Sequence, residues 1–156
     1  SEDAMGRALE RYGLLFVRIY LGAFNLASGA NHFLQITPRP VGGDPITVAY
    51  TVAATNAGLF TVAKILEITA GAMLLFNIAP ALALILLVPV TTTIFGLNFF
   101  SSPLPHIQAS GARNMLFHAI LFASYASYYY PMMTLRQRPA PFWRKPGRIT
   151  QILKAE

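Results

Sequence analysis

Two charged side chains, Lys64 and Glu67, stand in the otherwise apolar run TVAKILEITAGAMLLFN, residues 61 to 77. A spacing of three residues places both on one face of a helix, and Gly71 falls on the same face. A charge at the centre of a bilayer costs about 3 kcal/mol on insertion scales, so it should face the protein interior and have a partner. The spacing therefore indicates either an interhelical lock or a ligand-facing site.

Each of the other long apolar runs also carries polar and small residues on one face. Spacings of three and four residues connect Arg18, Gly22, Asn25, Gly29 and His32 in the first run. Similar stripes hold Thr91 and Asn98 in a later run, and Asn114 and His118 in the last. Small residues let membrane helices approach closely, and polar ones hydrogen-bond across the contact. Helix packing alone therefore accounts for the glycines, Asn25 and Thr91.

The remaining polar side chains form a candidate ligand site, which consists of His32, Lys64, Glu67, Asn98 and His118. Imidazole, ammonium and amide groups beside phenylalanines suit an amphipathic ring that carries carbonyl oxygens, such as a quinone, and they also suit a lipid headgroup. Two histidines on two helices are the minimum for haem ligation, but chance often meets that minimum, so we do not expect haem. We identify no catalytic residue and no metal ligand set.

Arg18 is a candidate partner for Glu67. Counted from the expected helix ends at 1.5 Å per residue, Arg18 lies roughly 9 Å from one side of the membrane and Glu67 lies near the middle. A long arginine side chain can cover this offset, so we predict an Arg18–Glu67 ion pair that locks the first two helices together. An i,i+3 contact between Lys64 and Glu67, and a ligand-facing role for Glu67, are the alternatives.

The composition predicts an all-α integral membrane protein. Of the 156 residues, 54% are hydrophobic and only 12% are charged. The gaps between charges are long enough for the ~20 apolar residues of a bilayer-spanning helix. We expect a four-helix transmembrane domain over residues 1–133, with spans at about 12–34, 57–77, 79–100 and 111–132.

Prolines and glycines divide these spans. The segment between the first two, with Pro38, Pro40 and Pro45, cannot form a continuous helix. Pro80 is expected in the first turn of the third span, and Pro89 should kink it. The chain has no cysteine, which excludes thiolate catalysis, disulfides and cysteine-ligated metals.

Basic residues set the expected orientation. The tail over residues 134–156 carries six lysines and arginines against Glu156 alone. By the positive-inside rule, both termini of a four-span protein face the cytoplasm. Phe142 and Trp143 lie among the tail charges, so we expect the tail to contact anionic lipid headgroups and not nucleic acid.

Several of these motifs, taken in order, resemble the DoxX family of small four-helix bacterial membrane proteins. The resembling features are Arg18 with Gly22, the segment Gly29 to Phe33, the Lys-x-x-Glu-x-x-x-Gly pattern that ends at Gly71, and the proline-opened third helix. The resemblance covers roughly residues 14 to 132. One position departs from it, because relatives tend to carry a histidine where this chain has Asn98.

The resemblance implies a multi-pass protein of the bacterial inner membrane and, for some members, association with membrane oxidoreductases that feed quinone. Our first expectation is a small non-catalytic accessory subunit of a larger membrane redox or energy-converting complex, because no convincing catalytic constellation is present. The alternative is a quinone- or lipid-binding protein with a polar pocket inside the bundle, which takes part in quinone-linked electron transfer. The expected partners are the lipid bilayer and either a larger complex or further copies of the chain.

Overall fold

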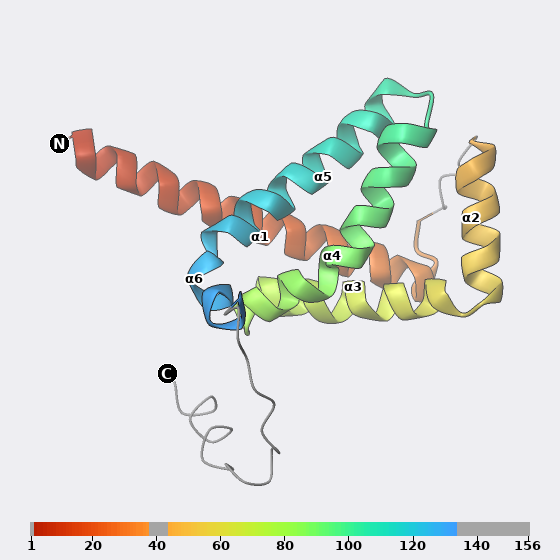
Figure 1. Ribbon diagram of the computed structural model, residues 1–156, viewed down its shortest axis with the longest axis horizontal. Helices are drawn as coiled ribbons and strands as arrows, with labels where there is room; N and C mark the ends of the chain where they lie inside the picture. The colour runs from red at the N-terminus through yellow and green to blue at the C-terminus, as the bar shows by residue number, and fades with distance from the viewer. Residues whose placement is uncertain (1, 38–43, 134–156) are drawn as a thin grey trace, which may run out of the picture.

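The computed structural model describes residues 2–37 and 44–133, and every regular element within these ranges is a helix (Figure 1). The chain forms α1 (Glu2–Leu34), α2 (Pro45–Asn56), α3 (Leu59–Leu75), α4 (Pro80–Phe95), the π-helix η1 (Gly96–Ser101), α5 (Pro105–Ser124), α6 (Ala126–Tyr129) and the 3₁₀-helix η2 (Tyr130–Met133). The all-α prediction is confirmed. The predicted basic tail, residues 134–156, lies outside the described residues.

Two segments are long and apolar enough to cross a membrane: Met5–Leu34 of α1, and Pro80–Ser101, which joins α4 to η1. Helices α2 and α3 satisfy the same test together, but the chain bends by 91° between them. The described part of the chain therefore offers two candidate spans, or three if the bent pair is one span. The helix α5 has 20 residues but is not among these candidates.

The helix boundaries follow from local sequence. Pro80 and Pro105 each lie in the first turn of their helix, where the missing N–H has no intrahelical role. The carboxylate of Asp44 caps α2 by accepting the backbone N–H of Thr47 at 2.9 Å. Gly58 has φ +75°, a left-handed conformation that favours glycine, and this lets the chain turn between α2 and α3.

The contact between α1 and α3 is the most extensive helix contact in the described chain. Glycines make it close. A Cβ atom on Gly71 would lie 2.6 Å from the backbone nitrogen of Leu26 and 2.8 Å from the carbonyl oxygen of Gly22. The two helices therefore touch backbone to backbone, as expected for small residues at a helix interface in lipid.

The buried apolar core is shared by α1, α3, α4 and α5. Pro89 cannot donate a hydrogen bond within α4, and Figure 1 shows α4 bending between its two halves. The chain then continues through η1 and returns along α5, which packs against α4. The largest fully buried apolar side chains are leucines, namely Leu21, Leu74, Leu84, Leu87 and Leu121.

Candidate functional site

The charged pair of α3 is buried and internally satisfied. The Nζ atom of Lys64 lies 2.9 Å and 2.8 Å from the two carboxylate oxygens of Glu67. Glu67 is only 2% exposed, and the side chain of Lys64 is 13% exposed. The ammonium also donates to the hydroxyl of Ser28 on α1, at 3.0 Å. The pair therefore belongs to α3 and is tied to α1 through Ser28.

Arg18 has a different partner from the one predicted. Its Nη1 donates to the Oδ1 atom of Asn77, which lies just beyond the end of α3. The prediction of an Arg18–Glu67 pair is therefore wrong, and the structure contains its i,i+3 alternative.

The glycine contacts explain this correction. Gly22 lies against Gly71 and Leu75, and Gly29 lies against Lys64 and Ile68, so α1 and α3 are antiparallel with a fixed register. This register places Arg18 opposite the end of α3, about eight residues beyond Glu67. At 1.5 Å per residue the offset is about 12 Å, too far for the guanidinium to pair with that carboxylate.

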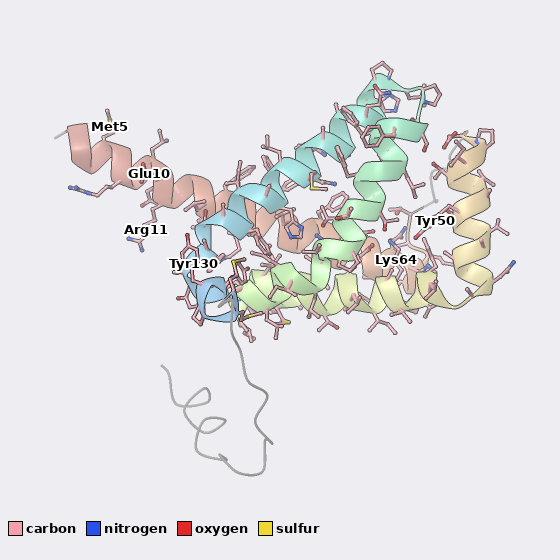
Figure 2. The ribbon with its side chains drawn as sticks, viewed as in Figure 1. Met5, Glu10, Arg11, Tyr50, Lys64 and Tyr130 are labelled. Carbon is pink, nitrogen blue, oxygen red and sulfur yellow. The ribbon has the colours of Figure 1, made fainter. Side chains whose placement is uncertain are left out.

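A cavity of about 240 Å³ lies between α2, α3 and α4, and both Lys64 and Glu67 line it. Most of its wall is apolar. The hydroxyl-bearing residues Tyr50, Thr51 and Thr93 also line it. Figure 2 shows Tyr50 and Lys64 in the angle between α2 and α3. A largely apolar wall with a few placed polar groups is the usual composition of a small-molecule site.

Phe60 links the ion pair to His32. The ammonium of Lys64 lies 5.2 Å from the centroid of the Phe60 ring, within cation–π range. The imidazole of His32 packs edge-on against the same ring, with 5.2 Å between the centroids. Sequence reasoning missed Phe60, although its position four residues before Lys64 on the same helix face is a usable signal.

The structure places the other two candidate residues elsewhere. His118 is buried, and its Nδ1 lies 2.8 Å from the hydroxyl of Thr91. It lines a separate cavity of about 360 Å³ between α4 and α5. Asn98, in η1, packs against Gly111, whose added Cβ would lie 2.8 Å from the Asn98 Cβ. The five predicted residues therefore divide into one group of three and two separate positions.

One buried polar side chain near His118 has unmet hydrogen-bonding capacity. Asn114 is 4% exposed, and within the described residues neither its Nδ2 nor its Oδ1 has a hydrogen-bond partner. An unsatisfied buried polar group costs about 1–3 kcal/mol. The contact between α4 and α5 is therefore less completely satisfied than that between α1 and α3.

The chemistry open to these groups is hydrogen bonding and charge pairing. Across residues 2–37 and 44–133, no cluster of three or more His, Cys, Asp or Glu side chains is placed to hold a metal ion. The wall of the cavity carries the Lys64 ammonium and the Glu67 carboxylate, which are paired with each other. No protein-family model, no curated protein and no solved structure matches the chain.

Proposed function

We propose that the chain is a four-helix integral membrane protein, similar to the DoxX family, that binds a quinone or a lipid headgroup in the cavity between α2, α3 and α4. The observation that supports this most is the Lys64–Glu67 ion pair in the wall of a largely apolar cavity. Lys64 supplies the hydrogen-bond donor, and Glu67 holds its ammonium in place. The apolar wall suits the ring and tail of an amphipathic molecule.

The hydrogen bonds of Lys64 define how a ligand would enter this arrangement. An ammonium has three N–H donors, and Glu67 and Ser28 take all three. A ligand carbonyl would replace the neutral Ser28 hydroxyl, because the bonds to the charged Glu67 carboxylate are stronger. Glu67 would then hold the ammonium in place while Lys64 contacts the ligand oxygen.

The four-span arrangement rests on how α5 packs. It lies against both α1 and α4, each of which contains a candidate membrane span. A 20-residue helix is about 30 Å long, enough to cross the hydrocarbon core beside them. With α3 as a further span, the chain has four crossings, and both ends face the cytoplasm as the basic tail favours.

Ligand retention tests the proposal. The full chain would be purified in mild detergent, its small molecules extracted and identified by mass spectrometry, and decylubiquinone binding measured. We expect a bound quinone or lipid in the wild type and at least tenfold weaker decylubiquinone binding in Lys64→Met. Tyr50→Ala, at a more exposed cavity position, tests the cavity without breaking the ion pair. Arg113→Gln, outside the cavity, is the matched control. A wild type that is empty and does not bind decylubiquinone would contradict the proposal.

The first part of α1 supports a second candidate, an accessory subunit of a membrane redox complex. With 33 residues, α1 is about 50 Å long, well beyond the ~30 Å hydrocarbon core. Figure 1 shows its N-terminal part projecting beyond the other helices. This part exposes an apolar stripe at Met5, Leu9 and Tyr12. A protein partner would cover that stripe where lipid tails do not reach it.

Migration in a gentle detergent tests this second candidate. Solubilised membranes from the native cell would be separated by size, and the chain detected in the fractions. We expect it to co-migrate with a larger complex, and Leu9→Glu should release it. A chain that migrates only as a free monomer would contradict the accessory role and leave ligand binding to be judged by its own experiment.

A further inference from the structure

A second cavity, distant from the ion pair, lies where α1 meets the end of α5. Its volume is about 440 Å³. It is lined by the basic Arg11 and Arg18, by apolar residues that include Leu14 and Leu121, and by the hydroxyl-bearing Ser124 and Tyr125. Neither the ion pair nor the proposed quinone or lipid site uses this cavity.

The charge of this cavity has one sign. Arg11 and Arg18 are seven residues apart, which places them on one face of α1 two turns from each other. Among the described residues, no carboxylate lines the cavity. Glu10 is adjacent to Arg11 in the sequence but is not among the residues that line the cavity. Two guanidinium groups without an acidic neighbour in the wall favour an anion.

Arg18 is held in place by Asn77 and has further N–H groups that Asn77 does not use. Asn77 takes one N–H from its Nη1, which leaves four of the five guanidinium donors. Its Nε is buried and has no hydrogen-bond partner within the described residues. A buried donor without an acceptor is costly, and an oxyanion supplies the missing acceptor. Guanidinium groups bind phosphate through paired N–H···O bonds, which requires a fixed orientation such as the one Asn77 provides.

Two other residues of the wall, Ser124 and Tyr125, carry hydroxyl groups. The hydroxyl of Ser124 donates to the backbone carbonyl of Ile120 at 2.8 Å. Its proton is therefore already used within α5. The leucines beside the arginines present an apolar surface that suits an acyl chain.

We propose that this cavity binds a phosphate-bearing anion, with Arg11 and Arg18 as its ligands. Two sources share this chemistry: the headgroup of an anionic phospholipid and free phosphate. The apolar wall favours the lipid. The inference is independent of the proposed quinone or lipid site, because it uses other residues and another cavity.

Native mass spectrometry of the full chain tests this site. The protein would be titrated in detergent with phosphatidylglycerol, with phosphatidylcholine as the uncharged comparison, and separately with inorganic phosphate. We expect phosphatidylglycerol to bind at least tenfold more tightly than phosphatidylcholine. Arg11→Gln and Arg18→Gln should each weaken it about tenfold, the usual effect of losing one charged hydrogen-bond donor. Arg113→Gln removes the same charge outside the cavity and should leave binding unchanged.

The arms of the titration distinguish the sources. Selective phosphatidylglycerol binding without an effect of phosphate supports the lipid, and tight binding of phosphate alone supports the free anion. Equal binding of both lipids with no phosphate binding overturns the proposal, as does a loss in Arg113→Gln that matches the loss in Arg11→Gln. If Arg18→Gln loses its fold together with the hydrogen bond to Asn77, Arg11→Gln alone tests the site, because Arg11 is exposed and its replacement should not disturb folding.

Discussion

The contact between α1 and α3 differs from the contact between α4 and α5, although both join apolar helices with polar stripes. At the first contact, glycines bring the backbones together and both oxygens of Glu67 are paired. At the second, α4 bends at Pro89, a cavity opens beside His118, and the amide of Asn114 has no partner within the described residues. Glycine spacing, more than polar content, therefore decides where these helices pack closely.

The largest effect should come from breaking the ion pair at the close contact. Lys64→Met leaves the carboxylate of Glu67 buried without its charge partner, which costs about 3–5 kcal/mol. Chemical unfolding in detergent measures the change. The double variant Lys64→Met/Glu67→Gln should recover much of the loss, because it removes both charges.

A double-mutant cycle sharpens this result. Lys64 and Glu67 should show a coupling energy of about 1–3 kcal/mol, since they are in direct contact. Arg18→Gln and Glu67→Gln should be additive to within about 0.5 kcal/mol, because the register of α1 and α3 separates them. Strong coupling between Arg18 and Glu67 would contradict the structure.

The glycine contact should give the next largest effect. Gly71→Ala places a Cβ atom against backbone atoms that cannot rotate away, so the helices must separate, at a cost of about 1–3 kcal/mol. Gly13→Ala is the matched control, because nothing lies within 4 Å of an added Cβ there. Thermal unfolding of both variants measures the difference. Equal melting temperatures would mean that α1 and α3 are not in backbone contact.

At the contact between α4 and α5, replacing a buried polar residue should preserve or raise stability, in contrast to the losses expected at the α1–α3 contact. Asn114→Leu removes two unpaired polar atoms and keeps a similar volume, so stability should stay within about 1 kcal/mol of the wild type or rise. Asn25 is also 4% exposed, but its Nδ2 donates to the carbonyl of Leu21 at 2.8 Å. Asn25→Leu should therefore cost about 1 kcal/mol. A larger loss in Asn114→Leu than in Asn25→Leu would show that Asn114 has a bound partner.

The smallest effect concerns the N-terminal cap of α2. This helix lines the cavity beside Lys64 and Glu67 and lies outside the α1–α3 contact. Hydrogen bonds from the side chain and backbone of Thr47 hold the pKa of Asp44 below its ordinary value of 3.8. Because the folded-state pKa is lowered, the cap contributes fully above pH 3.8 and is lost as the pH falls through the lowered pKa. The amide signal of Thr47 in an NMR titration reports this. Asp44→Asn should abolish the titration, and a midpoint at or above the ordinary value would contradict the cap.

Much of the helical layout could be predicted from the sequence. The apolar runs located α1, α3 and α4, and the first-turn position of Pro80 was correct. Two helices begin before the expected spans: α1 begins at Glu2 and α5 at Pro105, where the expected spans began at about 12 and 111. A proline such as Pro105 is common in the first turn of a helix. Hydropathy did not indicate this start, because the first turns of α5 are polar. The π-helical turn of η1 could not be predicted, because it depends on packing against α4 and α5.

The site was predicted less well, for a geometric reason. Depth was counted from expected helix ends, and an error of a few residues at each end shifts the pairing by several ångströms. The glycines of both helices were visible in the sequence, and matching them gives the register that separates Arg18 from Glu67. The division of the candidate residues depended on two changes of helix direction. Pro89 indicated the bend in α4, but its angle could not be predicted, and no pattern of spacing indicated the 91° turn before α3.

The glycine contact between α1 and α3 also determines which parts of the molecule can move. Sliding one helix along the other requires a step of about one turn, 5.4 Å, before the small residues can face backbone again. The two helices are therefore expected to move together as one rigid unit. Bending is then expected at the two breaks beside this contact, at Gly58 before α3 and at Pro89 within α4. Pro89 lines the cavity beside Lys64 and Glu67, and Gly58 directly precedes Leu59, which also lines it. Bending at either position would therefore change the shape of the cavity while the ion pair keeps its position on α3.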